Sequence, residues 1–233
     1  MSWVINRFDR NEELVPKLAD KIVGGLRHGI EANGRASLAV SGGSTPKTLF
    51  ERMANCELPW EKVTVTLVDE RWVDEDHADS NAKLVREHLL RRRAASATFI
   101  PLKTEAADPF VAENDVEGRL RDVPMPFDVV ILGMGNDGHT ASFFPGASTL
   151  RQALHPEGER LCQVVRPPSA PHDRMTLTLP VLLGAQHLIL HLVGKDKWQV
   201  LQKALQPGKT DELPVRAVLH QSQVLLDIYF AAE

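Results

Sequence analysis

The sequence predicts an α/β protein built on a mostly parallel sheet with helices on both faces. Short apolar runs alternate with amphipathic segments along all 233 residues. Strands that alternate with helices of this length form right-handed βαβ units, which give such a sheet. Because no shift in composition marks an internal boundary, we expect residues 1–233 to form a single domain.

The first half of the chain supplies the clearest elements. Apolar residues at every fourth position from Leu14 to Ile30 predict a helix over 12–32, which Asn33 and Gly34 end. The run ASLAV at 36–40 predicts a buried strand. The elements expected next are a helix at 46–54, a strand at 63–69 and a helix at 80–90.

The second half continues this alternation. We expect a helix within 109–121 and helices at 195–205 and 214–220, with strands at 127–133, 161–165, 187–194 and 224–230. In such sheets ligands bind outside the carboxyl ends of the strands. Three polar segments follow predicted strands and so are expected to meet there: SGGSTP at 41–46, DERWV at 69–73 and GMGNDGHTASFFPG at 133–146.

Composition and charge exclude several classes of protein. Hydrophobic residues make up 43% of the chain and charged residues 25%, which is ordinary globular usage. The formal net charge of -4 gives no electrostatic footprint for nucleic acid or an anionic membrane. The N-terminal segment lacks a signal-peptide core, and no apolar run approaches the roughly 20 residues of a membrane span, so we expect a cytoplasmic protein. Cys56 and Cys162 lack zinc-site spacing and are read as ordinary thiols.

The segment SGGSTP has the chemistry of a phosphate or sugar site. Its glycines allow close approach of the backbone, while Thr45 is expected to cap a helix whose first residue is Pro46. Backbone N–H groups at a helix start favour anions. A tight turn with capping hydroxyls is an equally good reading of this motif alone, and the GK[ST] ending of a Walker A motif is absent. The candidate ligand contacts are Ser41, Gly42, Gly43, Ser44 and Thr45.

The segment GMGNDG spells GxGxxG after a strand, but it does not predict a dinucleotide site. That fingerprint needs a helix directly after the third glycine, whereas Pro145 and Gly146 interrupt one within two turns. In the same segment Asp137 and His139 stand two residues apart. An imidazole whose tautomer is fixed by a carboxylate can take up and return a proton near neutral pH. We therefore expect both residues to be catalytic.

Four further charged residues are candidates for the site. Asp69 and Arg71 stand at the end of the run VTVTLVDER. An isolated pair of this kind is most simply a structural ion pair. Because two other polar strand ends are expected nearby, Arg71 could instead stabilise an oxyanion while Asp69 orients water or a sugar hydroxyl. Arg174 and Lys197 stand next to predicted strands. Both could be solvated surface charges, or they could hold a phosphate.

Taken together and in this order, the motifs resemble the 6-phosphogluconolactonase family. The match covers SGGSTP, VDERWV with DSN at 79–81, GMGNDGHTASFFPG, RMTLTLPVL and GKDK. The resemblance implies the three-layer α/β/α, modified Rossmann-like fold shared with ribose-5-phosphate isomerase, CoA transferases and glucosamine-6-phosphate deaminase. It also implies hydrolysis of 6-phospho-D-glucono-1,5-lactone to 6-phosphogluconate in the oxidative pentose phosphate pathway, without metal or cofactor.

The resemblance also implies roles for individual residues. His139 takes the place of the family's catalytic base, and Asp69 and Arg71 match its active-site aspartate and arginine. Arg174 and Lys197 look like its phosphate-binding pair. The residues of SGGSTP at 42–45 match its ligand-binding loop, and the expected partner is a phosphorylated sugar lactone bound by a monomer or weak homodimer.

A close competitor shares the fold. In amino-sugar phosphate deaminases the fifth residue after the corresponding histidine is a glutamate that joins a proton relay, but here it is Phe144, which cannot relay a proton. This favours the lactonase. A non-catalytic sugar-phosphate sensor is the second alternative, although no basic DNA-binding segment precedes residue 36. Whether His139 or Asp69 acts as the general base stays open at this point.

Overall fold

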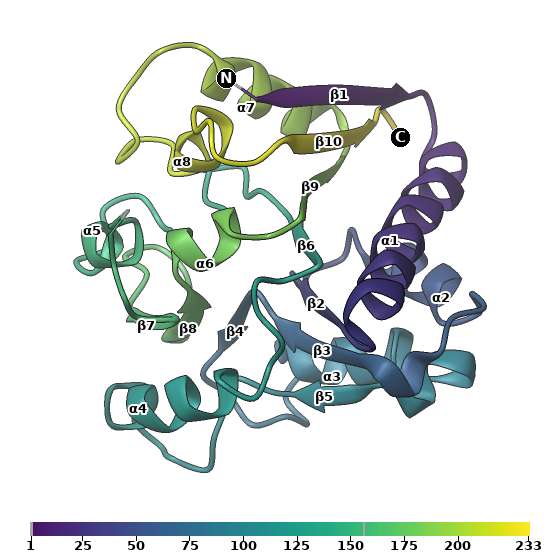
Figure 1. Cartoon of the computed structure of the whole chain (residues 1–233). Coiled ribbons are helices and arrows are strands. Elements are labelled where there is room, and N and C mark those ends of the chain that lie inside the picture. Colours follow the sequence, from purple (N-terminus) through teal and green to yellow (C-terminus); the bar gives the residue numbers. More distant parts are fainter. Residues whose placement is uncertain (1, 156) are drawn as a thin grey trace.

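The structure is a computed structural model that describes residues 2–155 and 157–233, and in this part of the chain two sheets form (Figure 1). The large sheet is parallel throughout. The small sheet is antiparallel. In spatial order the large sheet contains β1 (Trp3–Phe8), β10 (Leu226–Ala231), β9 (His187–Val193), β6 (Val129–Leu132), β2 (Ala36–Val40), β3 (Val63–Leu67) and β5 (Thr98–Ile100), and the small sheet contains β4 (Asp69–Arg71), β8 (Arg174–Leu177) and β7 (Cys162–Val165).

Helices cover the large sheet, and the long first helix crosses one of its faces. The α-helices are α1 (Asn11–Asn33), α2 (Lys47–Met53), α3 (Asn81–His88), α4 (Pro109–Leu120), α5 (Leu150–Ala153), α6 (Leu179–Leu183), α7 (Lys195–Leu205) and α8 (Arg216–Leu219), with short 3-10 turns at Trp60–Lys62 and Arg92–Ser96. Figure 1 shows α1 on the right of the sheet, with the small sheet and α4 to α6 on the left. The predicted α/β fold with a mostly parallel sheet is confirmed.

The sequence pattern of α1 accounts for how it packs. The four-residue apolar step places Leu14, Leu18, Ile22 and Leu26 on one face, and all four side chains are fully buried. The helix ends at Gly34, which adopts a left-handed conformation with φ of 74° and whose N–H donates to the carbonyl of Ile30 at 2.8 Å. The predicted helix and its end are therefore confirmed.

The prediction of one strand over 63–69 is wrong in its last part. β3 ends at Leu67, and β4 begins two residues later in the small sheet. Val68 joins the two sheets, because its N–H donates to the carbonyl of Val40 at 2.9 Å while its own carbonyl accepts from the N–H of Leu177 at 2.8 Å. Asp69 and Arg71 therefore lie on an antiparallel strand and not at the end of a parallel one.

The segment 161–165 is a strand as predicted, but it belongs to the small antiparallel sheet as β7. β1, β5 and β8 were not among the predicted strands. β10 pairs with β1 on one side and with β9 on the other. The first and last strands of the chain therefore lie side by side in the large sheet.

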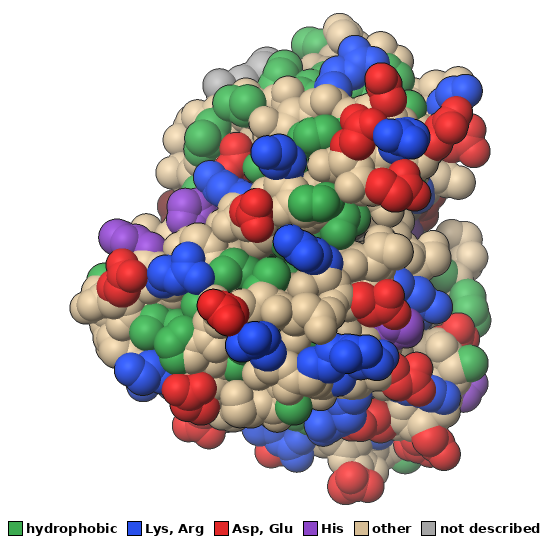
Figure 2. Space-filling model, turned by 90° about the vertical axis from the view of Figure 1, so that its right-hand side faces the viewer, with side chains coloured by type: hydrophobic (Ala, Val, Ile, Leu, Met, Phe, Trp, Pro, Cys, Tyr) green, Lys and Arg blue, Asp and Glu red, His purple; other side chains and the backbone are tan. Residues whose placement is uncertain are grey.

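Charged side chains of both signs are mixed on the surface. Figure 2, which views the molecule from the side of α1 in Figure 1, shows acidic and basic groups interspersed over this face. No helix among the described residues has the length and apolar character that crossing a membrane requires.

Candidate active site

A cleft with a volume of about 260 Å³ lies at the carboxyl ends of β2, β6 and β9. This is where a parallel α/β sheet places its ligands. The cleft brings together residues from all three predicted polar segments. Of the predicted site residues, it is lined by Ser41, Gly42, Gly43, Ser44, Thr45, Asp69, Arg71, His139 and Lys197.

The segment after β2 forms one wall of the cleft. The Ser41 hydroxyl accepts from the N–H of Gly133 at 3.3 Å and so ties the end of β2 to the end of β6. At Gly42 a Cβ atom would come within 1.8 Å of Oδ1 of Asn81, so only glycine fits there. The expected cap at Thr45 is wrong, because α2 begins at Lys47 after Pro46 and has no side-chain cap. Thr45 instead lines the cleft.

Asp69 and Arg71 reach the cleft from β4. The Asp69 side chain is buried, and its Oδ2 accepts a hydrogen bond of 2.6 Å from the Ser142 hydroxyl. Nη1 of Arg71 donates to the carbonyl of Asp79 at 2.6 Å. Each side chain is thus fixed by a partner that lies outside the DERWV segment, and the two are not paired with each other in the described contacts.

Glu70, between these two residues, was not predicted as important, yet it organises this wall of the cleft. Its buried carboxylate accepts from the backbone N–H groups of Arg71 at 2.7 Å and of Asn81 and Ala82 at 2.8 Å each. Burial raises the pKa of Glu70 to about 7; these N–H donors oppose the shift, while the charge of Asp69 adds to it. Glu70 therefore joins β4 to the first turn of α3.

The raised pKa of Glu70 makes a pH-dependent contribution to stability. A folded-state pKa of about 7 against an ordinary value of 4.5 means that the contribution is fully present below pH 4.5 and is lost as the pH rises through 7. Glu70→Gln lacks this titration. Between pH 4.5 and 8 the free energy of unfolding of wild type should therefore fall by about 3 kcal/mol relative to that of Glu70→Gln. Urea unfolding at both pH values measures this. The exposed Glu87→Gln is the control, and equal pH slopes for wild type and Glu70→Gln would contradict the prediction.

His139 and Asp137 form the pair that the sequence predicted. Nδ1 of His139 lies 2.5 Å from Oδ1 of Asp137, and the N–H of His139 donates to the same oxygen at 3.2 Å. Since a carboxylate can only accept, Nδ1 carries the proton and Nε2 stays free to accept one. Partial burial acts to raise the pKa of Asp137, but the hydrogen bond and charge of His139 outweigh it, and the pKa lies below its ordinary value.

Two neighbours fix the His139 ring. A Cβ atom at Gly135 would lie 2.2 Å from Nδ1 of His139, so glycine leaves the space that the imidazole occupies. On another side the Phe144 ring stacks on the imidazole, with 4.3 Å between ring centroids. Phe144 is buried, and the imidazole thus has an apolar partner at position 144.

The two predicted phosphate-binding residues occupy different places. Lys197, in the first turn of α7, lines the cleft, and partial burial lowers its pKa while the charges of Asp137 and Asp196 oppose the shift. Arg174 is buried on β8 opposite Arg71 and is not among the residues lining the cleft. Its guanidinium carbon lies 5.7 Å from the centroid of the Phe144 ring. The structure brings Lys197 to the cleft, and a role of Arg174 in phosphate binding stays a prediction.

His191, which the sequence did not single out, is a further cleft-lining residue. It lies on β9 with 3% of its surface exposed, and neither ring nitrogen has a hydrogen-bond partner in the described part of the chain. Burial lowers the pKa of His191 to about 4. Its position inside an apolar run, HLILHLV, gave no signal of this kind.

This histidine should make the protein sensitive to acid. A folded-state pKa of about 4 against an ordinary 6.5 contributes stability that is present above pH 6.5 and is lost as the pH falls through 4. When the pH falls from 7 to 4, the free energy of unfolding should decrease in both proteins. The decrease should be smaller in His191→Leu than in wild type, by up to about 3 kcal/mol. Urea unfolding at both pH values tests this, with the exposed His28→Leu as the control. If wild type and His191→Leu lose the same amount, His191 does not titrate as described.

Metal-ligating side chains gather beside this cleft. Among residues 2–155 and 157–233, the group of three that could share an ion is His77, Asp79 and His172. The carbonyl of Asp79 is the acceptor for Arg71 described above. The group lies outside the lining of the cleft itself.

Comparison with known proteins gives consistent matches over almost the whole chain. The sequence model of a family described as glucosamine-6-phosphate isomerases/6-phosphogluconolactonase matches residues 9–226. A Rhizobium meliloti protein named 6-phosphogluconolactonase is 44% identical over 231 residues, which cover 99% of this chain and 100% of that protein.

Solved structures agree with these sequence matches. The crystal structure of a 6-phosphogluconolactonase from Shewanella baltica superposes with a TM-score of 0.96 at 42% identity, covering 98% of this chain and 97% of that one. A monomeric glucosamine-6-phosphate deaminase superposes with a TM-score of 0.77 over 97% of this chain and 96% of its own, but at 19% identity it shares the fold alone.

Proposed function

This chain belongs to the family of glucosamine-6-phosphate isomerases and 6-phosphogluconolactonases, and from this we propose that it is an enzyme that hydrolyses 6-phospho-D-glucono-1,5-lactone to 6-phosphogluconate, a step of the oxidative pentose phosphate pathway. The observation that carries the choice of reaction is the pairing of His139 with Asp137 and Phe144. This arrangement supplies one base and no second proton carrier at position 144, which suits hydrolysis of a lactone.

In the proposed mechanism His139 is the general base. Its Nε2 takes a proton from a water whose oxygen attacks C1 of the lactone, and Asp137 stabilises the imidazolium that forms. The tetrahedral intermediate then collapses, the bond between C1 and the ring oxygen breaks, and His139 returns the proton to that oxygen. The burial of Asp69 and its short hydrogen bond from Ser142 support an orienting role for Asp69 over that of the base.

The remaining residues of the cleft bind and stabilise. Arg71 carries a fixed positive charge that can interact with the oxyanion of the intermediate. Lys197, the hydroxyls of Ser44 and Thr45 and the backbone N–H groups of their loop are the groups that would hold the phosphate. Correct placement of C1 beside His139 then follows from binding at the far end of the substrate.

The proposal extends to the organisation of the protein. Residues 1–233 would act as one lactonase domain, which the pairing of β1 with β10 supports. We propose a cytoplasmic monomer or weak homodimer that works on a small phosphorylated lactone and binds neither nucleic acid nor membrane.

One assay separates this function from the alternatives. The protein is given freshly prepared 6-phosphogluconolactone and, separately, glucosamine 6-phosphate, and acid and ammonia release are followed against the spontaneous background. Acid release from the lactone without ammonia from the amino sugar is the expected result. Ammonia without acid would identify a deaminase, and binding of either compound without turnover would identify a sensor.

A further inference from the structure

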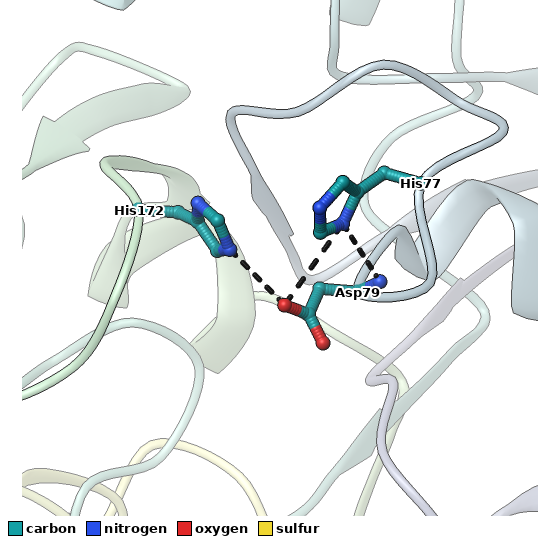
Figure 3. A group of neighbouring side chains, drawn as sticks. All are labelled: His77, Asp79 and His172. Atoms are coloured by element: carbon teal, nitrogen blue, oxygen red, sulfur yellow. Dashed lines mark hydrogen bonds and ion pairs between the residues drawn. The ribbon is translucent and has the colours of Figure 1, made fainter.

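His77, Asp79 and His172 form a cluster beside the cleft (Figure 3). His77 and Asp79 come from the loop between β4 and α3, whereas His172 comes from the loop between β7 and β8. Nε2 of His172 lies 3.0 Å from Oδ2 of Asp79, and Nδ1 of His77 lies 3.9 Å from the same oxygen. Figure 3 shows the two imidazoles on either side of the carboxylate. Two loops distant in sequence thus present one carboxylate and two imidazoles to a common point.

We propose that this cluster is a binding site for a single divalent cation of the zinc type. Two imidazole nitrogens and one carboxylate oxygen are a donor set that Zn²⁺ takes at about 2.0–2.2 Å, leaving a fourth position for water. Tetrahedral binding at such distances places ligand atoms about 3.3 Å apart. The three ligand atoms already lie within 4.8 Å of one another, so rotation of side chains is enough to close the site.

The side chains have the freedom that this closure needs. Exposed fractions of the side chains are 46% for His77, 49% for Asp79 and 28% for His172. Nδ1 of His77 accepts from the N–H of Asp79 at 3.0 Å, so a cation bound to Nδ1 replaces that hydrogen bond.

The backbone around His172 is built to present its imidazole. His172 has a φ of 68°, a left-handed conformation that costs free energy for a residue with a side chain. Its neighbour Asp173 forms two hydrogen bonds with Arg166, at 2.9 and 2.8 Å, and the Asp173 carbonyl accepts from the N–H of Trp72 at 2.8 Å. These contacts hold the loop without any help from the cluster, so the position of His172 is preorganised.

The donor atoms of the cluster also select the class of cation. Late first-row divalent ions prefer imidazole, whereas Mg²⁺ and Ca²⁺ prefer all-oxygen sites, so the donor set selects the former class. This inference is independent of the proposed lactonase activity.

The test uses Co²⁺ as a spectroscopic probe on untagged, chelator-treated protein, with Zn²⁺ competition to measure affinity. Wild type is expected to bind one equivalent of Co²⁺ with a visible absorption band that Zn²⁺ abolishes. His172→Asn and His77→Ala should each weaken binding at least tenfold. Asparagine is chosen because it tolerates the left-handed conformation of residue 172, and circular dichroism confirms that the variants are folded.

Two controls make the result specific. His28→Ala removes an exposed histidine on α1 and should bind as wild type does. His139→Ala removes the histidine of the cleft, which also faces a carboxylate. Wild-type affinity in both His172→Asn and His77→Ala, or a loss confined to His139→Ala, would overturn the proposal, as would the absence of a Co²⁺ band in wild type.

Discussion

His139→Ala is expected to lower kcat for the lactone by about 10²–10⁴-fold, the range that follows removal of a general base. The reason is geometric: Nδ1 is engaged by Asp137 at 2.5 Å, which leaves Nε2 as the basic atom in the cleft. Rates are measured at several pH values with the spontaneous hydrolysis subtracted. The fold should survive, since the imidazole is partly exposed and its main partner is a single carboxylate.

In the same mechanism Asp137 stabilises the protonated His139. Asp137→Asn removes the charge that stabilises the imidazolium, so kcat should fall at least tenfold, and the double variant should be little worse than His139→Ala alone because both residues act as a unit. Ala replacement of the exposed His28 is the matched control. Near wild-type hydrolysis by His139→Ala, combined with inactivity of Asp69→Asn, would instead make Asp69 the base.

Elements of the fold could be predicted well where the local apolar pattern determines the secondary structure. They could be predicted less well where the pairing of distant strands determines it. The apolar patterns of β2 and α1 are each compatible with only one type of element. The observed bounds of both elements agree with the predicted ones to within one residue. The run VTVTLVD has the same local character on both sides of Val68. The change of sheet there depends on Val40 and Leu177, which are far away in sequence, and no local propensity contains that information.

β1 is one of the three strands that were not predicted, and its position at the edge of the large sheet explains why. β1 has the sequence WVINRF, in which Asn6 and Arg7 break the apolar run, and Val4 is 47% exposed. A strand paired on one side only needs fewer buried side chains than a central one. Its assignment depends on β10, which supplies the backbone partners from the other end of the chain.

The candidate site divides in the same way. Asp137 and His139 stand two residues apart in one loop, so their pairing could be predicted from the sequence. The partners Ser142 for Asp69 and Asn81 for Gly42 are set by tertiary packing and could not. The histidine and its carboxylate partner can thus be predicted from their spacing in one loop. The groups that hold the other side chains in place can be identified only from the three-dimensional structure.

Arg71→Ala is expected to lower kcat by about 10²–10³-fold with a smaller change in KM, because a donor that meets the developing oxyanion acts mainly in the transition state. The side chain is held by the Asp79 carbonyl at 2.6 Å, so its charge has a fixed position before the substrate binds. Arg71→Lys keeps the charge but loses the planar fork that can bond to that carbonyl and to an oxyanion together, and it should recover only part of the rate. Steady-state kinetics of both variants, beside the exposed Arg52→Ala, measure this. A large rise in KM at unchanged kcat would instead assign Arg71 to binding of the substrate's phosphate, and the oxyanion would then depend on backbone N–H groups of the cleft.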